Sequence, residues 1–226
     1  MKTTTSYRTP KTLLSLIALF LLTVCIASCG KSDNGSVGLS AYVTAVNSAE
    51  ASAPQDAYVD NNKLNSSAMA YTQATAYVAV KTGDHQVQFK TAGTTTVNNT
   101  SSLSTEGNNY YTVFYTEDKS TVTTHDEHTA PSSGKARVRF INLSSAVASN
   151  VDFGLAAGSK IVSGLAYKVA SAYYDVDAAT TFSLYAAGSS TVMLSIPATI
   201  QAGHIYTIYV SGATQATVTY HVLVQN

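Results

Sequence analysis

Three features of this 226-residue sequence predict an all-β protein made of two tandem β-sandwich domains. Apolar and polar residues alternate with a period of two in segments rich in Val, Thr and Tyr, which is the pattern of half-buried strands. Clusters of Gly, Asn, Asp and Ser separate these segments, and such residues favour tight turns. The segments also recur after about 95 residues, which indicates a repeated structural unit.

The composition supports a folded protein and argues against two other classes. Apolar residues make up 45% and charged residues only 12%, with 13 basic residues balancing 13 acidic ones. Low charge combined with many Val, Thr and Tyr residues argues against intrinsic disorder. Nucleic-acid binding is also not expected, because the sequence has no basic cluster to neutralise phosphates.

Residues 1–28 are predicted to be a signal peptide. A basic start with Lys2, Arg8 and Lys11 precedes an apolar run over 13–26. This run is too short to be counted as a membrane-spanning helix on length alone. An ordinary secreted protein and an uncleaved anchor helix are the alternatives that this run leaves open.

The sequence Ile26-Ala27-Ser28-Cys29 at the end of this segment resembles the lipobox of bacterial lipoproteins. The resemblance implies that the thiol of Cys29 accepts a diacylglycerol and that Cys29 becomes the first residue of the mature protein. Residues 29–40 then form a lipidated polar tether. The start of this tether loosely resembles the surface-export signal of Bacteroidetes lipoproteins. We therefore expect a lipid-anchored protein of the cell envelope, at the outer membrane, on its periplasmic face or at the cell surface.

The two cysteines are consistent with this prediction. Cys25 leaves with the signal peptide and Cys29 is acylated, so the mature chain has no thiol left for a disulfide. An exported protein without disulfides depends on its hydrophobic core for stability.

The repeat assigns the rest of the chain to two domains, 41–124 and 136–226. Residues 43–47 align with 138–142, Tyr58 aligns with Phe153, and Ala92-Gly93 aligns with Ala187-Gly188. Each unit is expected to hold about seven strands in two packed sheets. The clearest alternating segments, in chain order, are 87–90, 110–115, 182–185 and 217–224.

Residues 125–135 are predicted to be a linker, because Pro, Gly, Ser and charged residues occur there without periodicity. The linker is short, so we expect the two sandwiches to lie end to end with limited freedom. His125, Asp126, Glu127 and His128 form the densest group of possible metal ligands. Four consecutive residues in a flexible linker do not converge on one ion, so a solvated linker is favoured and no metal or cofactor is expected.

The segment 131–144 resembles the opening strand of the bacterial domain of unknown function 4397. Val151-Asp152-Phe153, 187–194 and 202–207 resemble later motifs of that family. The resemblance is good over 135–226 and weaker over 41–123. The sequence departs from the family pattern at two positions, with Ser145 in place of the usual Pro and Gly154 in place of the usual Tyr. The resemblance implies tandem immunoglobulin-like or transthyretin-like β-sandwiches in exported, often lipid-anchored proteins, and it supplies no catalytic residues.

The residues also give no concrete support for an enzyme. The G-x-S-x-G pattern of a nucleophile elbow is absent from the sequence, and the only mature cysteine is expected to be acylated. Asp175 and Asp177 share one face of a predicted strand, as paired catalytic carboxylates can. We favour a role in solubility, because the other repeat has Ala79 and Lys81 at the aligned positions.

Tyr is the one residue type in excess, with 15 in the chain. Tyr71 and Tyr167 occupy equivalent positions, and Tyr173 follows the second of them. These three are weak candidates for a binding surface, because exposed Tyr packs on sugars and protein partners. Their recurrence in both repeats favours a structural role, since a residue needed for the fold recurs in each copy.

The expected function is therefore a non-enzymatic, lipid-anchored envelope protein that acts as a binding or spacer module. Its partners are expected to be the membrane, through the lipid, and an envelope protein or a glycan. One alternative is a fimbrial-type subunit that assembles by strand exchange, with 217–224 as the donated strand. Another alternative is a glycan-binding accessory lipoprotein.

Overall fold

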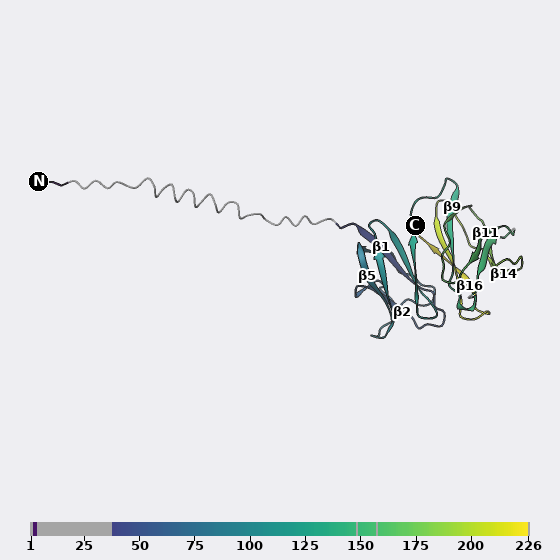
Figure 1. Ribbon diagram of the computed structural model, residues 1–226, viewed down its shortest axis with the longest axis horizontal. Coiled ribbons are helices and arrows are strands. Elements are labelled where there is room, and N and C mark those ends of the chain that lie inside the picture. The colour runs from purple at the N-terminus through teal and green to yellow at the C-terminus, as the bar shows by residue number, and fades with distance from the viewer. Residues whose placement is uncertain (1, 4–37, 148, 157, 226) are drawn as a thin grey trace. The chain divides into compact units, whose positions relative to one another are not determined.

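The computed structural model describes residues 2–3, 38–147, 149–156 and 158–225 (Figure 1). The signal peptide, Cys29 and most of the tether lie outside these residues. The chain divides into one unit that ends at Gly38 and a second unit, Leu39–Asn226, and only the second is described below. No helix in the described part of the chain has the length and apolar character of a membrane span.

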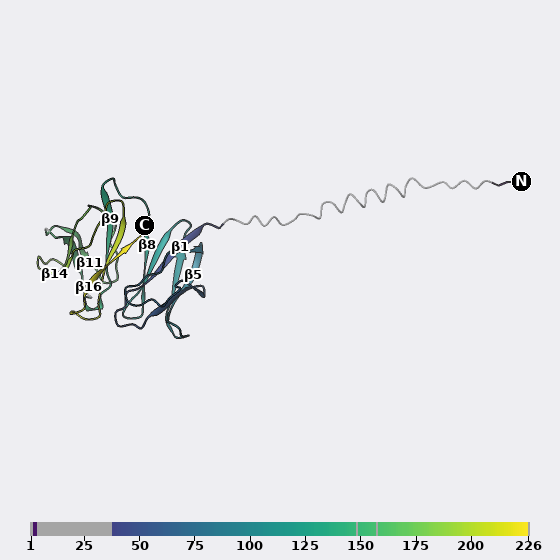
Figure 2. The same ribbon diagram turned by 180° about the vertical axis from the view of Figure 1, so that it is seen from behind.

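The second unit is all-β, as predicted, with four sheets that form two sandwich-like units (Figures 1 and 2). Sandwich 1 combines the sheets β4-β1-β7-β8 and β3-β2-β5-β6. Its strands are β1 (Ser40–Asn47), β2 (Gln55–Val59), β3 (Asn62–Lys63), β4 (Val78–Lys81), β5 (Gly83–Thr91), β6 (Val97–Thr105), β7 (Tyr110–Tyr115) and β8 (Thr121–Asp126).

Sandwich 2 repeats this strand order eight strands later, in the sheets β12-β9-β15-β16 and β11-β10-β13-β14. Its strands are β9 (Lys135–Asn142), β10 (Val151–Leu155), β11 (Lys160–Leu165), β12 (Tyr174–Asp177), β13 (Phe182–Ala186), β14 (Val192–Ile196), β15 (Ile205–Ser211) and β16 (Thr219–Val224). A 3-10 turn, Ser145–Val147, follows β9. The sequence repeat therefore corresponds to a repeat of topology.

In each sandwich, the first strand lies at the centre of its sheet in a parallel pair. β1 pairs with β7, with Val43 opposite Tyr111, and β9 pairs with β15, with Val138 opposite Tyr206. One face of each pair fills the core of its own sandwich. The buried side chains there include Val43, Phe89 and Val113 in sandwich 1, and Val138, Phe140, Phe153 and Ile208 in sandwich 2.

The alignment of Tyr58 with Phe153 is wrong by one residue. The structurally equivalent residues are Asp56 and Asp152, two buried carboxylates that each accept a hydrogen bond from a turn glycine. The donors are the amides of Gly93, at 3.1 Å, and Gly188, at 2.9 Å. Tyr58 therefore corresponds to Gly154.

At position 154 a side chain has no room. A Cβ there would lie 2.7 Å from the carbonyl oxygen of Ser159. The close approach of the chain at Ser159 explains why sandwich 2 has Gly at the position where sandwich 1 has Tyr58.

Two predicted boundaries change in the structure. β8 extends to Asp126, so His125 and Asp126 belong to a strand and the connection between the sandwiches runs from 127 to 134. The segment proposed for donation forms β16, an edge strand already paired with β15 from Tyr206–Val224 to Ser211–Thr219. Asp175 and Asp177 lie on edge strand β12, where they pair with Arg137 and Lys135 of β9.

Asp152 is predicted to be important for stability, because its buried carboxylate also accepts the amide of Gly164 at 2.7 Å. Replacing Asp152 by Ala leaves two backbone donors without their acceptor and is expected to lower the free energy of unfolding by about 1.5–3 kcal/mol. Urea unfolding measures this change. Asp177→Ala, at an exposed edge position, is the control, and equal midpoints for the two variants would contradict the assignment.

Candidate functional site

The central strands of both sandwiches are buried on both faces. β1, β7, β9 and β15 turn alternate side chains away from their own core. At the starts of β1, β7 and β9 these side chains are half-buried, and along the rest of these strands and all of β15 they are buried. Together with neighbouring residues they form a third apolar cluster, here called the interface cluster: Val46, Phe114, Val122, Ile141, Leu143 and Tyr209. The rings of Phe114 and Tyr209 meet edge to face at 5.4 Å. The sandwiches therefore pack through the sheets β4-β1-β7-β8 and β12-β9-β15-β16, and the expected end-to-end arrangement is wrong.

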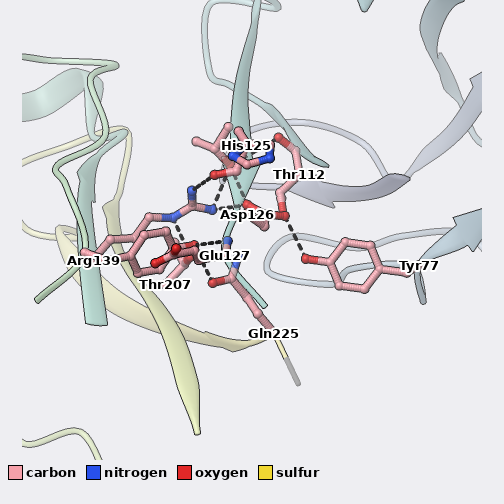
Figure 3. A network of polar contacts seen from close by, with 10 residues as sticks. Tyr77, Thr112, His125, Asp126, Glu127, Arg139, Thr207 and Gln225 are labelled. Atoms are coloured by element: carbon pink, nitrogen blue, oxygen red, sulfur yellow. Dashed lines mark hydrogen bonds and ion pairs between the residues drawn. The ribbon is translucent and has the colours of Figure 1, made fainter. Parts of the chain in front are cut away.

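Arg139 of β9 is the largest polar side chain in this interface and is only 2% exposed. Its Nε donates to Thr207 Oγ1 of its own sandwich at 2.8 Å. Its two terminal nitrogens cross to sandwich 1, where they donate to the His125 carbonyl oxygen at 2.8 Å and to Thr124 Oγ1 at 2.7 Å. One of them also forms an ion pair with Asp126 (Figure 3).

Asp126 is fully buried at the other end of this ion pair. Its carboxylate also accepts hydrogen bonds from Tyr77 Oη at 2.7 Å, from Thr124 Oγ1 at 3.0 Å and from Thr112 Oγ1. Burial and the neighbouring carboxylate strongly raise the pKa of the Tyr77 hydroxyl, so Tyr77 remains a donor. A buried charge pair stabilises a fold only when its remaining polar atoms are satisfied, and here protein groups supply those contacts.

Tyr173 supports the guanidinium from the side of sandwich 2. Its ring centroid lies 4.9 Å from the Cζ atom of Arg139, which is within cation–π distance. Its hydroxyl donates to Gln225 Oε1 at 2.7 Å and accepts the amide N–H of Glu127 at 3.4 Å. Burial raises the pKa of Tyr173.

The two repeats differ at both ends of the ion pair. The strand registers place Thr44 of sandwich 1 and Arg139 of sandwich 2 at equivalent positions. Asp126 is opposite Tyr110 on β7. The backbone N–H of Gln225 donates to the carbonyl oxygen of Ile205, which is the equivalent residue on β15. Asp126 and Gln225 are therefore equivalent as well. The remaining network residues are matched, Tyr77 with Tyr173 and Thr112 with Thr207.

Further polar contacts surround the interface cluster. Lys168 forms an ion pair with Asp118 and donates to Ser120 Oγ at 2.7 Å. Glu50 Oε2 accepts the amide of Ala213 at 2.8 Å. The interface is therefore held by apolar packing, a buried ion pair and polar contacts at its edge.

The family comparison agrees with this architecture over the first sandwich. The family described as "Domain of unknown function (DUF4397)" matches residues 41–154, which cover sandwich 1 and continue through β9 and most of β10. The chain belongs to this family. The greater part of this match lies in the first repeat, where the weaker resemblance was expected, and the match ends at residue 154. No curated protein matches the chain in sequence.

One solved structure that matches is the "Crystal structure of CBMbc (family CBM26) from Eubacterium rectale Amy13K in Complex with Maltoheptaose". The identity is 13%, and the match covers 82% of this chain and 97% of the other. The TM-score is 0.29, which is too low to transfer a ligand.

The tyrosines proposed for binding in this DUF4397 protein lie at or near the interface. Tyr71 Oη is 2.7 Å from Ser211 Oγ and 3.1 Å from His221 Nε2, both in sandwich 2. Tyr173 belongs to the network around Arg139. The Tyr167 hydroxyl is buried without a hydrogen-bond partner among the described residues, and the pKa of Tyr167 is raised by burial and by Asp118 and Glu117. These positions favour the structural interpretation of the tyrosines.

The four possible metal ligands do not converge. Asp126 faces Arg139, while His125 is exposed and its ring meets the Tyr111 ring edge to face at 5.5 Å. Glu127 forms an ion pair with Arg137 at 3.1 Å. Across the described ranges, no group of three or more His, Cys, Asp or Glu residues is arranged around one point.

Sequence reasoning missed Arg139 as a site residue. It noted this residue only as part of the opening strand and assigned Asp126 to a solvated linker. The repeat carried the available signal. Arg139 lies in the middle of β9 at the position that Thr44 has in β1, and Asp126 ends β8, the strand that precedes β9. A charge at such a position needs a partner when it is buried.

A double-mutant cycle tests the ion pair, using residues from the other repeat. Arg139→Thr and Asp126→Gln each leave one buried charge unpaired and are expected to lower the free energy of unfolding by about 3–5 kcal/mol. The double variant, which has neither charge, is expected to lose less than the sum of the two single losses. Urea unfolding measures all four proteins, and strictly additive losses would show that the pair is not coupled.

Acidification is expected to weaken the edge of the interface. Burial of Asp118 opposes its ionisation, but hydrogen bonds from Lys168, Thr116 and Ser120 outweigh burial and place its pKa below the ordinary value of 3.8. The ionised carboxylate therefore contributes stability above that ordinary value, and the contribution is lost as the pH falls toward the lowered pKa.

The measurement is the thermal midpoint as a function of pH. Between about pH 6 and pH 2, Asp118→Asn is expected to show a shallower fall than the wild type. The control is Asp84→Asn, at an exposed position, and this variant is expected to keep the wild-type dependence of the thermal midpoint on pH. Parallel curves for the wild type and Asp118→Asn would contradict the prediction.

Proposed function

We propose that this chain is a non-enzymatic, lipid-anchored protein of the cell envelope, in which two sandwiches act as one rigid spacer that holds a binding surface away from the membrane. The observation that carries this proposal is the interface between the sandwiches. Central strands buried on both faces and a desolvated ion pair are features of a permanent contact and not of a flexible linker between independent domains.

The buried charges support a structural role. Within the described part of the chain, the buried charged side chains are Asp56, Asp126, Arg139 and Asp152. Each of them is hydrogen-bonded inside the protein, to turn amides or across the interface. None of these groups is left free for proton transfer or nucleophilic attack, which are the tasks for which enzymes bury charge.

The lipid anchor rests on the sequence Ile26-Ala27-Ser28-Cys29. Two or more acyl chains on Cys29 give stable attachment, because each buried methylene contributes about 0.8 kcal/mol. Residues 29–39 reach at most about 36–40 Å when fully extended. The spacer therefore stays close to the outer membrane, whichever face carries it.

The strand-exchange alternative is not favoured by the position of β16. His221 on this strand contacts Tyr71 of the other sandwich, and Leu223 packs against the interface cluster. Donation of β16 to a neighbour would remove these contacts and expose β15. A spacer that keeps β16 in place agrees better with the geometry.

The anchor is tested by cysteine variants in a bacterial host that processes lipoproteins. Cys29→Ala is expected to abolish incorporation of labelled fatty acid and to release the protein from the membrane fraction. Cys25→Ala is the matched control, because it changes the neighbouring cysteine of the signal peptide and is expected to leave both properties intact. Membrane retention of unlabelled Cys29→Ala would contradict the proposed anchor.

A further inference from the structure

The repeat creates a second position that is equivalent to the Arg139 site. Around Arg139 lie the Tyr173 ring and the backbone and side chains of 124–126. Around the equivalent Thr44 lie Tyr77 and residues 223–225. The two positions therefore have matching walls, one strand end and one Tyr from opposite sandwiches.

The side chain at the centre differs. Arg139 fills the space at its own position, whereas the short Thr44 leaves a cavity of about 280 Å³, here called the Thr44 cavity. Its walls come from both sandwiches: Thr44, Thr75, Ala76 and Tyr77 from the first, and Leu223, Val224 and Gln225 from the second. This volume is near the lower end for small-ligand sites and suits one monosaccharide-sized molecule.

The wall chemistry excludes a cation like the guanidinium of Arg139. Leu223 stands where the Arg139 site has the hydroxyl of Thr124, and Gln225 stands where it has the carboxylate of Asp126. The Thr44 cavity therefore offers an uncharged wall with apolar surface from Ala76, Leu223 and Val224. A neutral ligand with a small apolar group fits this wall best.

Gln225 identifies the polar group that the ligand must carry. This residue is 3% exposed, and among the described residues its Nε2 has no hydrogen-bond partner. Its orientation is fixed, because Tyr173 Oη accepts the Glu127 amide and so donates to Oε1 of Gln225. An unpaired buried N–H donor is costly, and an acceptor supplied by a ligand would remove that cost.

We propose that the Thr44 cavity binds an N-acetylated monosaccharide unit. The carbonyl oxygen of the acetamido group accepts from Gln225 Nε2, and its methyl group packs against Ala76, Leu223 and Val224. One sugar hydroxyl donates to Thr44 Oγ1, which lines the same cavity and gives its own hydrogen to the carbonyl oxygen of Thr75 at 2.8 Å. This proposal goes beyond the spacer function and holds whether or not the chain is lipid-anchored.

Binding is expected to adjust the cavity wall. Nε2 of Gln225 is covered in the empty cavity, so the acetamido oxygen reaches it only when neighbouring side chains shift. The side chain that shifts is expected to be Val224, which is 50% exposed on edge strand β16. The carboxamide resonance of Gln225 should therefore report directly on binding.

Titration of the ¹⁵N-labelled protein with N-acetylglucosamine tests the proposal, with glucose as the control sugar that lacks the acetamido group. N-acetylglucosamine is expected to shift the Gln225 carboxamide and the amides of Tyr77 and Leu223 at concentrations up to roughly 10 mM. Glucose is expected to leave them unchanged. No shift with N-acetylglucosamine, or equal shifts with glucose, would overturn the proposal.

Two variants locate the site. Gln225→Glu keeps the acceptor for Tyr173 but removes the Nε2 donor, and it is expected to weaken binding about tenfold or more. Thr44→Arg fills the cavity and is expected to abolish binding. Unchanged binding in folded Gln225→Glu would overturn the site, and equal binding of N-acetylalanine methylamide would overturn the assignment to a sugar.

Discussion

The burial of Arg139 and Asp126 between two sheets is the constraint on which the rest of this structure depends. A guanidinium and a carboxylate removed from water stabilise a protein only when they pair and when their other polar atoms are satisfied. Thr207 and Tyr173 supply these contacts from sandwich 2, and His125, Thr124, Thr112 and Tyr77 supply them from sandwich 1. Separation of the sandwiches would leave each charge without most of its partners. The two sandwiches are therefore one mechanical unit, although each has a core of its own.

The same pair explains how two similar sheet faces select each other. Val46 and Phe114 on one face correspond to Ile141 and Tyr209 on the other, so apolar packing alone would let either face meet a copy of itself. Two sandwich-2 faces would bury two Arg139 guanidiniums opposite Gln225, and two sandwich-1 faces would bury two Asp126 carboxylates opposite Thr44. Only the pairing of a sandwich-1 face with a sandwich-2 face joins the opposite charges. Divergence at two positions of the repeat thus gives specificity, and it leaves the Thr44 cavity as a consequence.

Much of this fold could be predicted from the sequence, because alternation and turn residues act locally. The strands, their β-sandwich arrangement and the repeat follow from such patterns. The packing of one sandwich against the other was not predicted, although Val46 and Phe114 carried a usable signal. Strands that are apolar on both faces are covered on both faces. Arg139 was missed because an isolated charged residue in a strand is usually assigned to the solvent-facing side. Only the three-dimensional structure shows that Asp126 forms an ion pair with it. The alignment of Tyr58 was wrong by one residue because a constant spacing of 95 residues was applied. The equivalence of Asp56 and Asp152 becomes visible only through their hydrogen bonds from the turn glycines.

The rigidity of the contact between the sandwiches can be measured by residual dipolar couplings of the protein in a weakly aligned medium, because these report the orientation and mobility of each sandwich independently. If the two sandwiches form one rigid unit, couplings from strands β1–β8 and β9–β16 fit a single alignment tensor of one magnitude. Two tensors that differ in magnitude or direction, as independently moving domains give, would contradict a rigid unit held by Arg139 and Asp126.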